Sequence, residues 1–533
     1  MIKYLFIINF CFIFIYSSEL YNNPYWLKLL HYKNNQSQID DPTFFLSSNG
    51  KISPKDELIA TLQAIKRDNP KDGDSTQCLF PARTRWLKKK LSNQNIHECK
   101  SLASKLKELN FKTLYLVYTS SYINSPASAF GHTFLRFDSN EDTPLLSYGL
   151  NYSAKVDSSN IFSYVYKGVF GGFEGIYRVA PYYEIVNKYS NMEKRDIWEY
   201  KLKFTPKEIE RITLHMIEMQ RYYSNYYFNS QNCSYNLLWF IDLAKDGLNL
   251  TDDFNYIVAP MDTIKTIGDK GLIELSIFRP SKISKIKNIY QSIPHKKIAK
   301  KFWQEHNISI LNQLDINEQR DILDISILKE NNQTLLQYRS KLGISPSKKI
   351  TKTNPIYANL ASKLNISLSN KNQLLYGIRA SYHDIYDIDY DFNLGEYISF
   401  FDIQMINNRL DSVTFLKINS MPPIDKLYQP ISWGVEFGYK DNKLFASGRG
   451  GISYSIFDTL IFFEPTIKLS NNIGFGYHTG MLKTINKIKF GVIAQKTYNI
   501  NINSFITYQL NNNMAINIYI DKKSHSLALF YYF

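Results

Sequence analysis

The sequence NSQNCSYNLLWFID, residues 229–242, brings together a short polar loop, a single cysteine and an apolar run. The apolar run predicts a buried helix, with Asn232 or Gln231 as its cap and Cys233 in its first turn. At a helix start, unpaired backbone N–H groups and the helix dipole stabilise a thiolate and lower the pKa of a thiol from about 8.5. The alternative is a packed core thiol, the commoner situation for a cysteine beside an apolar run.

The length and composition of the chain set broad limits. Its 533 residues predict roughly two to four domains. A net charge of +15 permits contact with nucleic acid or with anionic lipid and cell-wall surfaces. The sequence holds no nucleic-acid motif and its lysines are spread over surface-like segments, so we expect no nucleic-acid partner. An aromatic content of 15% favours an extracytoplasmic or membrane-contacting protein.

The N-terminus has the pattern of a secretory signal peptide. In residues 1–18 a basic residue is followed by an apolar run and then by small residues. Cleavage is expected near Ser17 or Ser18 and would remove Cys11. No later segment offers about 20 continuous apolar residues, so no helical membrane span is predicted.

The cysteine count bears directly on Cys233. Without Cys11, three cysteines remain in an oxidising compartment. The simplest assignment pairs Cys78 with Cys99 and leaves Cys233 free. A bond from Cys233 to either of the other two stays open as an alternative, and it would remove the nucleophile.

A histidine precedes the cysteine in a strand-rich region. Residues 19–110 predict a small helical domain, after which the pattern changes to strands, with His132 at the start of the second one. If the following hairpin is centred between residues 141 and 142, position 132 faces position 151. The side-chain carbonyl of Asn151 could then accept the imidazole N–H and leave the other ring nitrogen for a thiol. The structural alternatives are a strand-end histidine and a plain turn asparagine.

An aromatic, glycine-rich segment follows at residues 161–183. It predicts either a lid or acyl-chain groove, or an irregular core hairpin. Residues 195–204 predict a strand. Thr205, Pro206 and Glu208 then mark the start of a helix that leads toward the cysteine loop.

Four segments together resemble the periplasmic domain of the Lnb-type bacterial lipoprotein N-acyltransferases, over roughly residues 111–265. The segments are 122–136, 177–183, 195–199 and 232–235. The resemblance implies an α+β, permuted papain-like cysteine domain, similar to the lecithin:retinol acyltransferase relatives, in which the histidine strand precedes the cysteine helix.

Carried onto this sequence, the resemblance makes Cys233 the nucleophile and His132 the base. Asn151 rests on the predicted strand pairing alone. The helical membrane spans expected of the named acyltransferases are absent from the sequence, which leaves the substrate open.

The remaining chain predicts two further parts. Residues 266–350 are basic and helix-prone, and we expect a connector that packs on the catalytic domain. Residues 351–533 alternate with a period of two in segments of about 10 residues with aromatic ends, and end in Phe533. This pattern indicates an antiparallel outer-membrane β-barrel of about twelve strands. A soluble β-sandwich is the alternative.

The sequence therefore predicts an outer-membrane protein with a periplasmic catalytic domain. The first functional hypothesis is a cysteine acyltransferase or hydrolase acting on membrane lipid or lipoprotein through a thioester. The second is a papain-like amidase or endopeptidase of cell-wall peptides, and the third is a non-catalytic barrel with a binding module. No cofactor or metal is predicted, and the sequence does not predict the oligomeric state.

Overall fold

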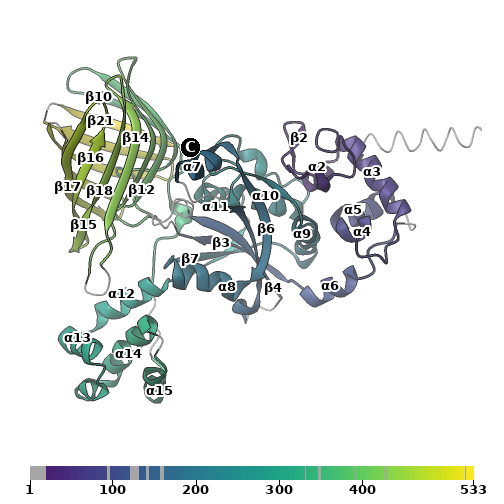
Figure 1. The fold of residues 1–533 in the computed structure, drawn as a ribbon, viewed down its shortest axis with the longest axis horizontal. Helices are drawn as coiled ribbons and strands as arrows, with labels where there is room; N and C mark the ends of the chain where they lie inside the picture. The colour runs from purple at the N-terminus through teal and green to yellow at the C-terminus, as the bar shows by residue number, and fades with distance from the viewer. Residues whose placement is uncertain are drawn as a thin grey trace, which may run out of the picture.

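Figure 1 shows the fold of the chain in a computed structural model. The predicted signal peptide, residues 1–18, lies outside the described residues. These are 20–92, 96–120, 131–139, 143–156, 161–330, 332–345, 350–390, 392–425, 429–497, 499–522 and 524–533.

Short helices dominate the N-terminal region. Proline stands in the first turn of α2, α3 and α5, where its missing N–H removes no helical hydrogen bond. The elements are α2 (Pro24–Leu29), β1 (Tyr32–Lys33), β2 (Gln36–Ser37), η1 (Pro42–Phe44), α3 (Pro54–Arg67), α4 (Thr76–Leu79), α5 (Pro81–Leu91) and α6 (Leu102–Leu109).

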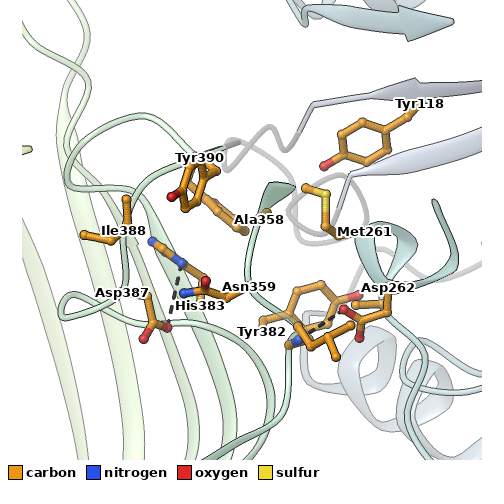
Figure 2. Close-up of a pocket in the computed structure, with 14 residues that line it drawn as sticks. Tyr118, Met261, Asp262, Ala358, Asn359, Tyr382, His383, Asp387, Ile388 and Tyr390 are labelled. Atoms are coloured by element: carbon orange, nitrogen blue, oxygen red, sulfur yellow. Dashed lines mark hydrogen bonds and ion pairs between the residues drawn. The ribbon is translucent and has the colours of Figure 1, made fainter. Parts of the chain in front are cut away.

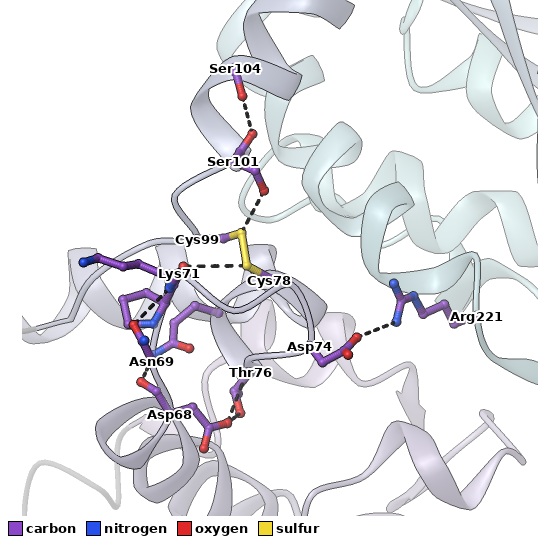
Figure 3. The surroundings of a disulfide bond; sticks show 12 residues. Asp68, Asn69, Lys71, Asp74, Thr76, Cys78, Cys99, Ser101, Ser104 and Arg221 are labelled. Atoms are coloured by element: carbon purple, nitrogen blue, oxygen red, sulfur yellow. Dashed lines mark hydrogen bonds and ion pairs between the residues drawn. A yellow bond between two sulfur atoms is a disulfide. The ribbon is translucent and has the colours of Figure 1, made fainter.

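A disulfide joins Cys78 of α4 to Cys99, which lies just before α6 (Figure 3). The two Cα atoms are 4.7 Å apart and 21 positions apart in sequence. The predicted pairing is confirmed, and Cys233 is a free, buried thiol.

A seven-stranded antiparallel sheet forms the centre of the molecule, in the order β8-β6-β5-β4-β3-β7-β9. The helices α9, α10 and α11 and the N-terminal helices share one hydrophobic core with this sheet. The strands are β3 (Thr113–Thr119), β4 (His132–Asp138), β5 (Tyr148–Lys155), β6 (Phe173–Pro181), β7 (Ile197–Leu202), β8 (Tyr223–Tyr226) and β9 (Ile273–Arg279). The helices are η2 (Pro144–Leu146), α7 (Ile161–Phe170), α8 (Tyr182–Val186), η3 (Asn187–Met192), α9 (Pro206–Met219), α10 (Cys233–Ala244), η4 (Thr251–Asp253) and α11 (Pro260–Asp269).

Two features of this region differ from the sequence-based expectation. The glycine-rich segment 161–183 is not a core hairpin, because it begins with helix α7. Gly171, with φ of 80°, ends that helix in the left-handed conformation that suits glycine. The sheet also continues past residue 265, since β9 pairs with β7 at its edge.

A group of helices follows the sheet and has a hydrophobic core of its own. Its contact with the sheet domain runs through Asp196, whose carboxylate accepts hydrogen bonds from the Ser281 N–H (2.8 Å) and the Ser284 hydroxyl (2.7 Å). In Figure 1 the helices α13, α14 and α15 lie away from the central sheet. The elements are α12 (Lys282–Ser292), α13 (Lys296–Glu305), η5 (Ile308–Gln313), α14 (Ile316–Glu330) and α15 (Gln333–Lys341).

The C-terminal part is a closed barrel of twelve antiparallel strands, which confirms the predicted barrel and its strand number. β10 closes the barrel by pairing with β21. After η6 (Pro355–Tyr357), the strands are β10 (Lys363–Ser369), β11 (Leu374–His383), β12 (Tyr397–Ile406), β13 (Arg409–Ser420), β14 (Ser432–Lys440), β15 (Lys443–Ile456), β16 (Thr459–Leu469), β17 (Ile473–Ile485), β18 (Ile488–Lys496), β19 (Ile500–Asn511), β20 (Met514–Asp521) and β21 (His525–Tyr532).

The two faces of the barrel wall differ in chemistry. Large apolar side chains such as Ile366, Phe463 and Leu527 are exposed on the outside, whereas polar ones such as Glu464 and Thr507 are buried. Alternation of this kind presents an apolar surface to lipid. No helix among the described residues is long and apolar enough to cross a membrane.

Candidate active site

Helix α10 begins at Cys233, as the sequence predicts. The Asn232 side chain caps the helix, because its carbonyl oxygen accepts the N–H groups of Ser234 (3.1 Å) and Tyr235 (3.3 Å). The amide nitrogen of the same side chain donates to the Val258 carbonyl at 2.7 Å. The cap is therefore fixed on both sides, and it holds the thiol at the helix start.

His132 lies beside the thiol from the first position of β4. Burial alone would raise the pKa of Cys233. The His132 imidazole opposes this by its charge and its closeness to the sulfur, and together with the backbone N–H of Thr133 it lowers the pKa of the thiol to about 7. The two candidate residues are thus brought together, and a substantial part of the thiol is ionised near neutral pH.

Asn151 completes the group that the sequence predicts. Its Oδ1 lies 2.6 Å from Nε2 of His132. The ring nitrogen left for the thiol is therefore Nδ1, and an Nε2–H donating to the amide oxygen fixes that tautomer.

The predicted register of this strand pair is wrong, although the contact exists. Leu135 pairs with Leu150, and Phe137 with Tyr148, so paired positions sum to 285 and not to the predicted 283. The short helix η2 in the connection shifts the pairing by two residues. A shift of two keeps every side chain on the same face of the sheet, so Asn151 still reaches His132.

Gly131 allows the backbone conformation with which the chain enters β4 at His132. Its φ is 79°, and a Cβ built there would lie 2.6 Å from the ring of Tyr118. Any other residue would meet both backbone strain and a clash with this ring. The glycine lets Tyr118 pack against the chain immediately before the histidine.

Tyr226, the last residue of β8, is a site residue that the sequence does not predict. Its hydroxyl oxygen accepts the backbone N–H of Cys233 at 3.2 Å. Burial and the negative charge of the neighbouring thiolate raise the pKa of Tyr226 well above its ordinary value, so the hydroxyl keeps its proton. Its position in the strand just before the cysteine loop points to the site, but the sequence does not distinguish Tyr226 from the other tyrosines in that stretch.

A buried ion-pair network stiffens the sheet around the histidine strand. The guanidinium of Arg136 on β4 contacts Asp138 (2.8 Å) and Glu199 of β7 (2.8 Å). Glu199 also accepts the hydroxyl of Tyr182 at 2.5 Å and pairs with Arg279 of β9 at 2.9 Å. These contacts bridge three strands and satisfy buried charges that would otherwise be costly.

The site places a buried thiol with a pKa of about 7 beside an imidazole. Among the described residues, no group of three or more His, Cys, Asp or Glu side chains is arranged to hold a metal ion. The fold and the site together define a class of protein, in which a mixed helix-and-sheet domain with a cysteine–histidine pair is carried on an outer-membrane barrel.

Three family models match parts of the chain. Residues 102–270 match the model described as the Lnb N-terminal periplasmic domain, so this part of the chain is similar to that domain. Two further models, both described as domains of unknown function (DUF7843 and DUF7840), match residues 18–90 and 352–527. No curated protein matches the chain.

Several solved structures resemble part of the chain. The KdgM porin is 10% identical, with 33% of this chain and 99% of that chain covered and a TM-score of 0.24. The NanC porin is 10% identical, with 32% and 99% covered and a TM-score of 0.24. The Acinetobacter baumannii outer membrane protein Omp33 is 13% identical, with 33% and 98% covered and a TM-score of 0.21.

The localisation follows from the barrel and from the family domain. A closed barrel with an apolar outer face lies in the outer membrane. The Lnb-type domain that precedes it lies in the periplasm.

Proposed function

We propose that the protein is an outer-membrane-anchored periplasmic cysteine acyltransferase, or a hydrolase of lipid or lipoprotein, that works through a thioester on Cys233. The observation that carries this proposal is the chain of contacts from the thiol to His132 and on to Asn151. Papain-like enzymes use the same set of cysteine, histidine and asparagine. The histidine strand precedes the cysteine helix here, which supports the permuted papain-like fold.

In the first step, the Cys233 thiolate attacks the carbonyl carbon of an acyl ester. The C–S bond forms as the carbonyl electrons move onto oxygen. When the tetrahedral intermediate collapses, the C–O bond to the alcohol breaks and the His132 imidazolium protonates the leaving alkoxide. The Tyr226 hydroxyl adjoins the thiol and the Cys233 N–H, and we assign it to the stabilisation of the oxyanion.

In the second step, an amine or a water molecule attacks the thioester. His132 accepts a proton from the attacking group, and Sγ leaves as the thiolate. Transfer to an amine gives an N-acyl product, whereas water gives a fatty acid. The Lnb-type domain and the membrane anchor favour a lipid or lipoprotein substrate over a cell-wall peptide.

The test uses the full chain in mixed micelles with a phospholipid that carries a radiolabelled acyl chain. The expected result is a hydroxylamine-sensitive label on the protein, which is absent from Cys233→Ser and passes to a lipopeptide with a free α-amine or to water. Folded protein that forms no thioester, with either a lipid or a lipopeptide donor, would overturn the proposal.

A further inference from the structure

The barrel reaches toward the active site at the end of strand β11. A cavity lies between the sheet domain and the barrel, and both contribute side chains to its wall, among them Tyr118, Met261, Tyr382, Ile388 and Phe392 (Figure 2). In that view Tyr382 is turned toward Asp262 of the sheet domain. The next residue, His383, is turned the other way, toward Asp387 in the loop after β11.

The backbone at Tyr382 is strained. Its φ is 82°, in the left-handed region that a bulky residue rarely adopts. Strain of this kind costs about 1–3 kcal/mol and persists where the surrounding structure imposes it, commonly at functional sites. This strained backbone belongs to a residue whose side chain points out of the barrel and into the interface with the sheet domain.

The cavity adjoins the segment that fixes the nucleophile. Val258, whose carbonyl holds the Asn232 cap, is followed by Ala259 in the cavity wall. Ala259 packs in one hydrophobic cluster with Tyr382 and the barrel residues Ile398 and Ile418. The Tyr382 hydroxyl is also within electrostatic range of Cys233.

We propose that Tyr382 is the barrel's contribution to the active site, forming the wall against which the acyl carbons nearest the thioester lie. The inference rests on the proposed function and adds the place of the fatty-acyl chain, which enters between the sheet domain and the barrel. The lining supports this class, since it is mostly apolar and aromatic.

The test compares two thiol probes on the full chain in mixed micelles. Iodoacetamide reports the reactivity of the thiol, and N-hexadecyl iodoacetamide reports the same chemistry with an alkyl chain attached. For each variant the ratio of the two alkylation rates at Cys233 is measured by mass spectrometry. The variants are Tyr382→Ala, which removes the wall, and Tyr382→Trp, which narrows the cavity. The control is Tyr386→Ala, because Tyr386 packs against Phe505 and Tyr519 in the barrel.

We expect the ratio of the N-hexadecyl iodoacetamide rate to the iodoacetamide rate to fall about tenfold in both Tyr382 variants. A change of this size corresponds to the loss of one good apolar contact. In Tyr386→Ala the ratio should stay at the wild-type value. The heat-dependent gel shift of the barrel confirms folding in each case. Equal ratios in wild type and in folded Tyr382→Trp would overturn the inference and leave the proposed function standing. A Cys233 that reacts with neither probe would instead contradict the proposed function.

Discussion

Nε2 of His132 and Oδ1 of Asn151 lie 2.6 Å apart, across two strands that pair two residues away from the simplest hairpin register. The contact fixes one face of the imidazole and leaves the opposite nitrogen for Cys233. Of Cys233, His132 and Asn151, only Cys233 is positioned by the start of a helix. The positions of His132 and Asn151 depend on the register of β4 and β5.

The first prediction concerns Asn151. Replacing it with alanine removes the acceptor that orients the imidazole, so the ring no longer holds Nδ1 against the thiol. We expect the iodoacetamide alkylation rate of Cys233 at pH 7 to fall by about 10-fold, because a thiol without an oriented imidazole beside it is less ionised at this pH. Asn187→Ala is the matched control, because among the hydrogen bonds of the described residues the Asn187 side chain contacts only the exposed Asn191. An unchanged rate in Asn151→Ala would remove this residue from the site.

The second prediction concerns the pH dependence of the thiol. Because the pKa of Cys233 is about 7, the alkylation rate should rise with pH and reach half of its plateau near pH 7. In His132→Ala, burial still raises the pKa of the Cys233 thiol, but the imidazole that lowers this pKa is gone. The pH at half of the plateau rate should therefore be higher than in the wild type. A midpoint that stays in place after this substitution would show that His132 does not activate the thiol.

The sequence predicts the barrel and the cysteine helix well because both depend on local pattern. Alternation along the strands between Lys363 and Tyr532 follows from one polar and one apolar face. The Asn232 cap depends on residue type at one helix start. Neither feature needs knowledge of a distant part of the chain.

The features that the sequence does not predict depend on distant contacts. The register of β4 and β5 depends on how η2 packs, and β9 joins the sheet although it follows α11. Tyr226 becomes part of the site only because β8 lies at the far edge of the sheet, next to β6. Tyr382 lies 149 residues after Cys233 in sequence, and only the docking of the barrel brings it near.

The third prediction concerns a buried acid between the N-terminal helices and the sheet domain. Burial raises the pKa of Glu218 to about 7, while its carboxylate accepts the N–H groups of Ala82 and Arg83 and contacts His215 at 3.0 Å. Since the folded pKa exceeds that of an unfolded glutamate, this group's contribution to stability is full below about pH 4.3 and is lost as pH rises through about 7.

Because buried, neutral His215 and His31 change stability in the opposite sense over the same range, the expected effect is a difference: between pH 5 and pH 7.5 the thermal stability of the periplasmic part should fall more, or rise less, in the wild type than in Glu218→Gln. Tryptophan fluorescence measures it, because Trp26, Trp86 and Trp239 lie in the core that includes these helices. Glu210→Gln, which changes an exposed acid on the same helix α9, should keep the wild-type slope. A Glu218→Gln slope equal to that of the wild type would contradict this assignment.

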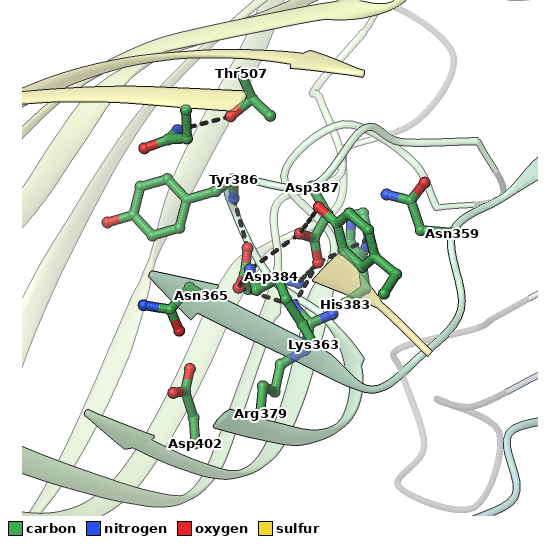
Figure 4. Close-up of polar contacts among 12 residues, drawn as sticks. Asn359, Lys363, Asn365, Arg379, His383, Asp384, Tyr386, Asp387, Asp402 and Thr507 are labelled. Atoms are coloured by element: carbon green, nitrogen blue, oxygen red, sulfur yellow. Dashed lines mark hydrogen bonds and ion pairs between the residues drawn. The ribbon is translucent and has the colours of Figure 1, made fainter. Parts of the chain in front are cut away.

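The fourth prediction concerns the loop between β11 and β12, which carries buried carboxylates at the end of the barrel that faces the sheet domain (Figure 4). Asp387 binds Lys363 (3.1 Å), the Tyr532 hydroxyl (2.8 Å) and Arg379. Asp384 pairs with the same arginine at 2.8 Å, and Asp389 pairs with Lys489 at 2.7 Å. Apolar residues of the loop, such as Ile385, pack with Phe462 and Phe505 of the barrel.

The loop between β11 and β12 should stabilise the folded barrel. Asp387→Ala leaves Arg379 and Lys363 as buried cations without a full set of partners, so we expect a loss of about 3–5 kcal/mol in the free energy of unfolding. Urea titration in detergent with the heat-dependent gel shift measures the loss. Asp411→Ala breaks a solvent-accessible pair with Lys440 (3.5 Å) and should cost about 1 kcal/mol or less. The double variant Asp387→Ala/Arg379→Met should recover part of the loss, because it also removes the orphaned guanidinium. If Asp387→Ala is no less stable than Asp411→Ala, the loop does not secure the barrel.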